Sequence, residues 1–244
     1  TPLWVLAVAT AFAVIFAKEV YGGTGMNIFN VALVTRAFIF FAYPSVISGD
    51  AVWVADSAIF GLGADIDGYT QATALGVAAT SGVAPAWDLN MVWGFIPGSI
   101  GETSVVAIAL GALILLGTGV ASWKTMLSVF VGGGLMAWVF NQWGNPDNAV
   151  AMMPWYQHLA LGGFCFGAVF MATDPVTSCR TECGKYIYGF LIGVVAVLIR
   201  VLNPGYPEGM MLAILLMNLF APLIDYYVYQ ANISKRAKRA LKSK

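Results

Sequence analysis

Charged side chains are scarce in this chain. Of its 244 residues, 12 are Lys or Arg and 12 are Asp or Glu, whereas 59% are hydrophobic and the mean hydropathy is +0.79. So few charges cannot cover a soluble particle of this size, and a soluble globular protein is therefore excluded. Long apolar runs stand in place of the charges. They predict an all-α integral membrane protein, a multi-span helical bundle.

Histidine and cysteine are also rare, with one and three residues respectively. Cys179 and Cys183 lack the paired spacing of a zinc or iron–sulfur site, and Cys165 lies within an apolar run, so we expect free thiols. His158 stands at the edge of an apolar run, where an interfacial side chain is expected. The sequence has no P-loop and no G-x-G-x-x-G after a strand, so a dinucleotide is expected to bind elsewhere.

Seven apolar runs approach the length needed to cross the hydrocarbon layer, which is about 30 Å thick. They are Leu3–Tyr21, Ile28–Tyr43, Val105–Trp123, Thr125–Trp143, His158–Ala172, Tyr186–Val201 and Met210–Tyr229. The second and the fifth are short and carry polar interruptions, which predicts discontinuous helices, broken or re-entrant, while the other five are expected to be complete spans. The chain then divides into first membrane helices (1–45), a loop region (46–102), later membrane helices (103–230) and a basic tail (231–244).

The basic residues predict the orientation. The tail holds half of all Lys and Arg, and such clusters remain on the cytoplasmic side of a membrane. Counting back through the spans places residues 44–102 on the periplasmic side, and that stretch contains six acidic residues and no Lys or Arg. We interpret the tail as a topology signal rather than a nucleic-acid or lipid site.

A few ionisable residues fall within the apolar runs. Arg36 lies midway along the second run, where burying a guanidinium in lipid costs at least about 2.5 to 3.5 kcal/mol unless a carboxylate, a phosphate or water compensates it. Arg200 and Lys18 lie near span ends and are expected to extend to the interface. Asp225 and Glu19, near the inner face, are candidates for sodium entry because hard cations prefer oxygen ligands. The alternative is that both are solvated boundary acids.

The loop region contains Asp67-Gly-Tyr-Thr70-Gln-Ala72-Thr73. This stretch resembles the pattern D-x-x-[S/T]-G-A-T, at which a flavin transferase joins FMN to threonine through a phosphodiester. Thr70, Ala72 and Thr73 match the pattern, and Gln71 replaces the glycine. The Thr73 hydroxyl would be an attachment point and not a catalyst, because it is unreactive at its own pKa. The alternative is a turn at the Asp-Gly pair followed by a threonine that caps a helix.

A second, non-covalent flavin has weaker sequence support. Asn27 and Asn30 are three residues apart at the start of an apolar run, where their amides could meet the polar edge of an isoalloxazine on one helical face. Trp53 offers a stacking plane. Asp174, before a proline, fits the end of a broken helix and is a candidate site residue. Helix capping is the alternative for the asparagines and for Asp174.

Several segments together resemble a known family. These are Gly25-Met-Asn-Ile-Phe-Asn30, the flavin-attachment heptad, Phe170-Met-Ala-Thr-Asp-Pro-Val-Thr-Ser178 and the basic tail. Over essentially the whole chain they resemble the multi-span membrane subunit that carries covalent FMN in the bacterial sodium-translocating NADH:quinone reductases. The corresponding subunit of the Rnf complexes, which are ferredoxin:NAD+ oxidoreductases, shares the M-A-T-D-P-V-T pattern. A subunit of that complex is therefore the alternative identification.

The resemblance implies a fold and a function. The fold would be a urea-transporter-like architecture of two inverted halves, of which this chain is expected to be the later part. FMN on Thr73 and a non-covalent riboflavin would relay electrons from NADH to ubiquinone, coupled to sodium export. Partners would be an NADH-oxidising flavoprotein subunit, a second subunit with covalent FMN, small membrane subunits and a periplasmic flavin transferase, at the bacterial inner membrane. A urea-transporter-like solute channel is the alternative of a different class.

Overall fold

The computed structural model describes residues 2–44, 52–54, 69–99, 101–206 and 208–242 of the chain. Apart from one two-stranded antiparallel ladder, the regular elements of this described part are helical, which confirms the prediction of an all-α membrane protein. The elements are α1 (Leu3–Ala17), η1 (Glu19–Tyr21), α2 (Val31–Ala42), β1 (Val52–Val54), β2 (Tyr69–Gln71), α3 (Ala74–Ser81), α4 (Asn90–Trp93), α5 (Val105–Gly117), α6 (Trp123–Trp143), α7 (Ala149–Met152), α8 (Trp155–Ala160), α9 (Phe164–Phe166), η4 (Gly167–Met171), α10 (Glu182–Leu202) and α11 (Met210–Lys242).

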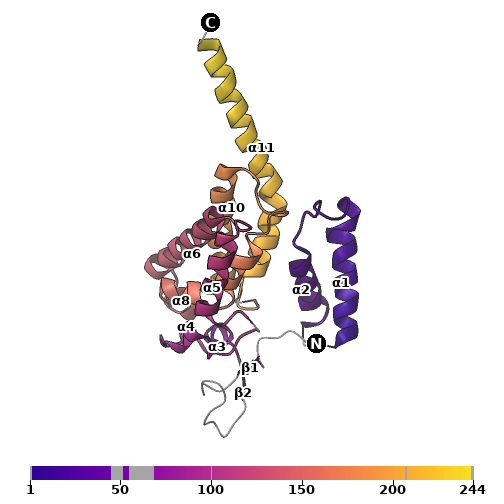
Figure 1. The fold of residues 1–244 in the computed structure, drawn as a ribbon. Coiled ribbons are helices and arrows are strands. Elements are labelled where there is room, and N and C mark those ends of the chain that lie inside the picture. The colour runs from indigo at the N-terminus through magenta and orange to yellow at the C-terminus, as the bar shows by residue number, and fades with distance from the viewer. Residues whose placement is uncertain (1, 45–51, 55–68, 100, 207, 243–244) are drawn as a thin grey trace.

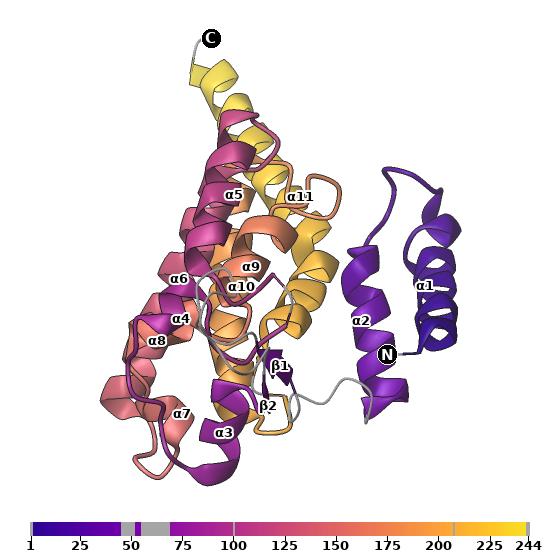
Figure 2. The same cartoon turned by 60° about the horizontal axis from the view of Figure 1, so that its bottom comes forward.

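The long helices run up and down between two ends of the molecule (Figures 1 and 2). We call them the lower end, which carries α3, α4, α7 and α8, and the upper end, from which α11 projects. In the described part of the chain, four helical segments are long and apolar enough to cross a membrane: Leu3–Tyr21, Trp123–Trp143, Glu182–Leu202 and Met210–Leu241. Five complete spans were expected, so one is missing.

The missing span is the third apolar run, Val105–Trp123. Its helix α5 ends at Gly117, because the Thr118 hydroxyl donates to the carbonyls of Ile114 and Leu115 and Gly119 turns into the left-handed region with φ 72°. The 13 residues of α5 reach only about 20 Å, short of the roughly 30 Å hydrocarbon layer.

The fifth run is broken, as its composition predicts. Helix α8 ends at Ala160, and the chain resumes as α9 and the wider turn η4. Gly162 and Gly163 lie between them with φ 64° and 65°, a conformation that costs glycine little. The second run forms α2, which is short but continuous.

Helices α6 and α10 form the centre of the bundle. Their backbones touch at small residues: a Cβ added to Gly132 would collide with the Phe190 carbonyl, and one added to Gly193 would collide with the Val129 carbonyl. Around this contact lies the main hydrophobic core, which includes Phe164, Tyr188 and Ile192. Glycines at the contact thus let the two backbones approach closely.

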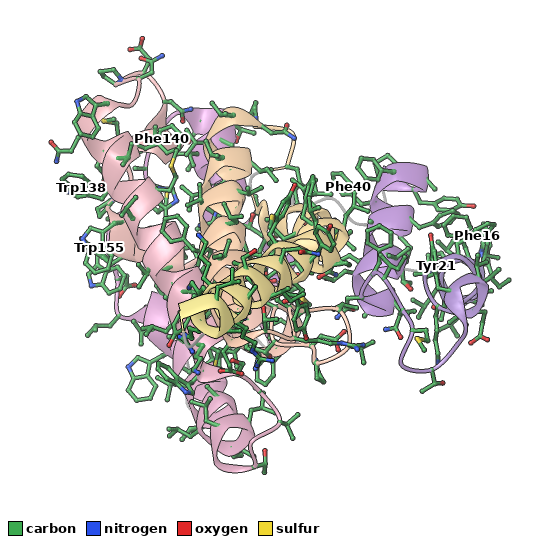
Figure 3. All side chains as sticks on the ribbon, turned by 90° about the horizontal axis from the view of Figure 1, so that it is seen from above. Phe16, Tyr21, Phe40, Trp138, Phe140 and Trp155 are labelled. Atoms are coloured by element: carbon green, nitrogen blue, oxygen red, sulfur yellow. The ribbon has the colours of Figure 1, made fainter. Side chains whose placement is uncertain are left out.

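The hairpin of α1 and α2 stands to one side of the bundle (Figure 2). Helix α2 faces the bundle, and the Phe40 ring meets the Tyr206 ring edge-on with centroids 4.7 Å apart. Phe16 and Tyr21 of the α1 side lie farther out (Figure 3). Seen from above, Trp138 and Trp155 mark the opposite margin of the molecule (Figure 3).

The basic tail is helical. Helix α11 continues for 33 residues to Lys242, so residues 231–242 extend the last span and are not a separate irregular tail.

The α6–α10 contact predicts different outcomes at neighbouring glycines. Gly132→Ala should lower the free energy of unfolding by about 1 to 3 kcal/mol, because the two helices must separate to admit the methyl group. Gly134→Ala is the matched control: its Cβ would lie 3.8 Å from the Trp155 ring, an ordinary contact, so we expect no loss and up to about 1 kcal/mol of gain from helix propensity. Denaturation in detergent, with gel filtration as the readout of the folded fraction, measures the free energy of unfolding of both variants. Equal losses would contradict the packing described.

Candidate functional site

Thr73 lies at the lower end as the N-cap of α3. Its backbone is extended, and its Oγ1 accepts a hydrogen bond from the Gly76 N–H at 3.2 Å. The side chain is buried. The capping interpretation of the heptad is thus confirmed as the local structure. It is compatible with flavin attachment, because an ester oxygen can still accept this bond.

The other residues of the heptad are placed only in part. Thr70 lies on β2, where its backbone pairs with that of Trp53 on β1. Ala72 directly precedes the cap and is half-buried. Asp67 lies outside the described residues, as do the side chains of Thr70 and Trp53.

A narrow cavity adjoins Thr73. Two acidic side chains, Glu102 and Glu208, line it together with Leu161 and Gly162 of the broken run. Helix α3 is held against this wall by Leu75, which is fully buried, and a Cβ on Gly162 would collide with it. The break after α8 therefore creates the space that seats the start of α3.

Two arginines balance the acids of this end. The Arg36 guanidinium makes an ion pair with Glu208 at 2.8 Å, which supplies the carboxylate that the sequence requires. Arg200 is fully buried and does not extend to the interface as expected. Its guanidinium donates to the carbonyls of His158 at 2.6 Å, Leu161 at 3.1 Å and Glu208 at 3.2 Å. Arg200 thus ties α10 to the broken run and to the loop before α11.

His158 was expected at the interface, and this is wrong. Its side chain is fully buried, and both ring nitrogens are without a hydrogen-bond partner in the described part of the protein. The cause is α8, which packs against α6 and brings the His158 carbonyl within reach of Arg200 on α10.

The asparagines lie at the upper end. Asn27 and Asn30 do not share a helical face, because α2 begins only at Val31. Asn30 is its N-cap and accepts from the N–H groups of Ala32 and Leu33, so the capping alternative is confirmed for it. Its amide nitrogen also lies 3.5 Å from the Asp174 carboxylate.

Asp174 ends the broken run. Its carboxylate accepts from the Val176 N–H at 3.1 Å and from the Thr177 hydroxyl at 3.0 Å. These bonds close a turn between η4 and α10 and cap neither helix, so the helix-capping alternative is wrong for Asp174. The contact with Asn30 joins two of the predicted site residues.

Beside this pair lies a cleft of about 510 Å³, which we call the asparagine cleft. Its lining residues include Asn27, Asn218, Asp225, Tyr226 and Tyr229. Pro222, inside α11, also lines it; a proline there cannot donate to the carbonyl one turn earlier and bends the helix. The polar groups and the bend give this cleft the character of a ligand site.

Asn218 is a site residue that the sequence analysis missed. Its amide meets the buried Tyr188 hydroxyl at 2.6 Å. With the amide turned to satisfy both of its groups, its oxygen accepts the Asn30 N–H at 3.2 Å. Asn218 therefore links α10, α11 and the start of α2. An asparagine within an otherwise apolar run was the available signal.

The two predicted sodium residues are not brought together. The Asp225 carboxylate accepts the backbone N–H groups of Arg180 at 2.8 Å and Thr181 at 3.1 Å, which anchors the loop before α10. Glu19 begins η1 and does not line the asparagine cleft. In the ranges that the structure describes, no three His, Cys, Asp or Glu residues form a metal-binding group.

The Arg36–Glu208 pair predicts a pH-dependent cost. Arg36→Met leaves the Glu208 carboxylate buried and unpaired, which should lower the free energy of unfolding by about 1 to 3 kcal/mol near pH 8. Burial and the neighbouring Glu102 carboxylate already raise the pKa of Glu208, and the loss of Arg36 raises it further. The cost should therefore vanish as the pH falls toward the unfolded value of about 4.3 and appear as the pH rises through the folded value.

The double variant Arg36→Met/Glu208→Gln is the control for this prediction. The double variant carries no ionisable group at either position. Its free energy of unfolding should therefore lack the steep decrease with rising pH that is expected for Arg36→Met. Thermal unfolding in detergent between pH 5 and pH 8 measures all three proteins. A cost for Arg36→Met that is independent of pH would show that Glu208 is not its cause.

Comparison with known proteins identifies the family of the chain. Residues 1–234 match the NQR2, RnfD, RnfE family. A protein of Chromohalobacter salexigens, named as a subunit of the Na(+)-translocating NADH-quinone reductase, is 54% identical over 242 residues, which cover 98% of this chain and 56% of that protein. Proteins of the same name from Pseudomonas aeruginosa and Azotobacter vinelandii are 50% and 51% identical, again over 98% of this chain and 58% of theirs. The chain thus spans somewhat more than half the length of these relatives, and it belongs to the NQR2, RnfD, RnfE family.

Proposed function

We propose that this chain is part of a membrane subunit of a redox-driven sodium pump, the sodium-translocating NADH:quinone reductase. The subunit carries FMN on Thr73 and a non-covalent riboflavin, and both relay electrons from NADH toward ubiquinone. The names of its relatives support the complex. The observation that carries the flavin assignment is the position of Thr73, the N-cap of a helix at one end of the bundle. The adjoining cavity of about 10 Å³ is too small for a flavin, so the FMN would lie outside it.

The helix start suits a phosphodiester. Free N–H groups and the helix dipole stabilise an anion at this position, and α3 presents them beside Thr73. In attachment, the Thr73 oxygen forms a bond to the FMN phosphorus of FAD, and the phosphoanhydride bond to AMP breaks. AMP leaves, and a periplasmic flavin transferase accepts the hydroxyl proton. The positive charges of Arg36 and Arg200 offset the negative charges of Glu102 and Glu208. The phosphodiester would therefore add its negative charge to an end that also contains cations.

The asparagine cleft is our proposed riboflavin site. Its volume of about 510 Å³ falls in the range of small-molecule sites. The amides of Asn27 and Asn218 supply donors and acceptors that match the polar edge of an isoalloxazine, and Tyr226 and Tyr229 supply aromatic faces. Asn30 and Asp174 hold the wall in place. Trp53 belongs to β1 at the lower end, so it would serve the FMN and not this flavin.

The two proposed flavins lie at opposite ends of the bundle (Figure 1). Thr73 is at the lower end and the asparagine cleft is at the upper end, so electrons that pass between them cross the membrane. The protein supplies position and electrostatics for this transfer, and the flavin ring supplies the redox chemistry.

Charge supports the orientation in the bacterial inner membrane. The upper end carries the basic residues outside the bundle interior, Lys18, Lys124, Arg180, Lys185 and the tail, together with four acids, Glu19, Asp174, Glu182 and Asp225. The lower end carries acids, Asp88, Glu102, Asp147 and Glu208, and outside the bundle interior no Lys or Arg in the described part. The upper end is then cytoplasmic and the Thr73 end periplasmic. Partner subunits would deliver electrons from NADH on the cytoplasmic side. Asp225 and Glu19, both at this end, are our proposed residues of the sodium path.

Separating covalent from extractable flavin tests both flavin sites. In the complex purified after co-expression with the transferase, Thr73→Ala should remove the fluorescent band of this subunit from a denaturing gel. Its intact mass should fall by one FMN beyond the residue change. Asn27→Leu should keep that band and weaken retention of riboflavin, identified by chromatography of the acid extract, about tenfold through the lost hydrogen bonds.

Thr70→Ala is the matched control, since it alters the neighbouring hydroxyl and should leave the band unchanged. An unmodified Thr73 peptide in active complex would overturn the covalent assignment. A subunit that holds neither flavin would instead favour the solute-channel interpretation.

Labelling of cysteines tests the orientation. Cys183 is exposed at the start of α10, at the upper end, so a membrane-impermeant maleimide should label it in inside-out vesicles and not in spheroplasts. Cys179 is buried, and burial together with Asp225 raises the pKa of its thiol to about 12, so it should not react at pH 7. Cys183→Ser should therefore abolish labelling of this subunit, and Cys179→Ser should leave it intact. Labelling in spheroplasts would reverse the proposed orientation.

A further inference from the structure

A second and larger cleft opens at the upper end. We call it the basic cleft, and its volume is about 850 Å³. It lies between the turn that joins α5 to α6 and the loop that precedes α10. The residues that carry the argument below are Leu116, Val120, Lys124, Arg180, Glu182 and Lys185. The flavin proposal does not use this cleft, although Arg180 also lines the asparagine cleft.

The cleft carries excess positive charge. Lys124, Arg180 and Lys185 face a single carboxylate, Glu182, so the three cations and one anion leave a net charge of +2. Lys124 and Lys185 both pair with Glu182, the latter at 2.7 Å. The Glu182 side chain is 61% exposed, and pairs in such positions are weak and readily rearranged. The cleft can therefore exchange this carboxylate for an anionic ligand.

Arg180 is the open member of the set. Its backbone N–H is fixed by Asp225 at 2.8 Å, but its guanidinium has no hydrogen bond or ion pair with any residue that the structure describes. The residue is exposed, so its guanidinium is free to bind a phosphate with two parallel hydrogen bonds. The starts of α6 and α10 add positive potential from the same side, and Ser122 makes no side-chain cap to the first turn of α6.

The surroundings are those of a membrane boundary. The Trp123 and Tyr186 rings meet edge-on with centroids 6.2 Å apart, and the Lys124 ammonium lies 5.8 Å and 5.9 Å from their respective centroids. Both rings are exposed, as aromatic residues are at the level of lipid headgroups. The cleft also has apolar lining, formed by Leu116 of α5 and the exposed Val120 of the turn after it.

We propose that the basic cleft binds one anionic glycerophospholipid. Its phosphate contacts Arg180 and Lys124, and its acyl chains lie against α5 beside Leu116 and Val120. A cationic rim beside an apolar wall at this level matches the headgroup and chains of a lipid. An acidic protein segment would leave the apolar wall uncovered. The site is distinct from the basic tail, whose side chains lie on the projecting part of α11.

Lipid binding to the full-length protein, purified in detergent with its natural partners, tests the proposal. Phosphatidylglycerol is titrated and the bound molecules are counted by native mass spectrometry. Arg180→Gln should weaken the tightest binding step about fivefold, and Lys124→Gln/Arg180→Gln should weaken it further. Phosphatidylcholine, which has no net charge, should show no such step. Gel filtration verifies that each variant remains folded and assembled.

A tail variant, Lys235→Gln/Arg236→Gln, is the matched control, because it removes two positive charges from the same end. This tail variant should leave the affinity of the tightest lipid-binding step unchanged. An equal loss of affinity in the tail variant and in Arg180→Gln would mean that the lipid is held only by the general positive charge of this end, and it would overturn the proposed site. Inorganic phosphate at a concentration of about 10 mM should not displace the lipid. Complete displacement would show that the cleft is a site for free phosphate and would overturn the lipid proposal. Release of a partner subunit by Arg180→Gln, with lipid binding unchanged, would identify a protein contact instead.

Discussion

The contact between the backbones of α6 and α10 supports the rest of the molecule. Gly132 and Gly193 let the two helices meet without side chains between them, so Phe164, Tyr188 and Ile192 can close around a rigid pair. The helices that carry the proposed flavin sites attach to this pair directly or through one further helix: α3 through α7, and α2 through α11. The broken run packs against α6, and the walls of both upper clefts begin at the first turns of α6 and α10 or at the α11 face that covers α10.

Buried polar groups determine how the other elements attach to that centre. At the lower end, Arg200 gathers three carbonyls from separate segments, and Arg36 joins α2 to the loop before α11. At the upper end, Asn218 and Asp174 hold the start of α2. Unsatisfied polar groups are costly in a membrane, so these bonds fix positions that apolar packing alone would leave free. They also place the two proposed flavin sites on the same scaffold at opposite faces.

Much of this was accessible from sequence, for identifiable reasons. Apolar length predicts the helical bundle, and the isolated Arg36 correctly required a partner. The identity of that partner, Glu208, was not predictable, because 172 positions separate the two residues. Arg200 and His158 were misplaced, because proximity to a span end does not reveal that α8 packs back against α6 and covers both side chains. The end of α5 depends on the Thr118 hydroxyl, which donates to carbonyls of its own helix. The length of an apolar run does not reveal such a hydrogen bond.

The length of α11 has a consequence for its basic residues. About 20 residues suffice to cross the hydrocarbon layer, so the remaining dozen lift Lys242 roughly 18 Å above it at about 1.5 Å per residue. Mobile ions screen charge beyond about 8 Å at physiological ionic strength. The outermost turn is thus electrostatically screened from the lipid surface and lies in the aqueous phase.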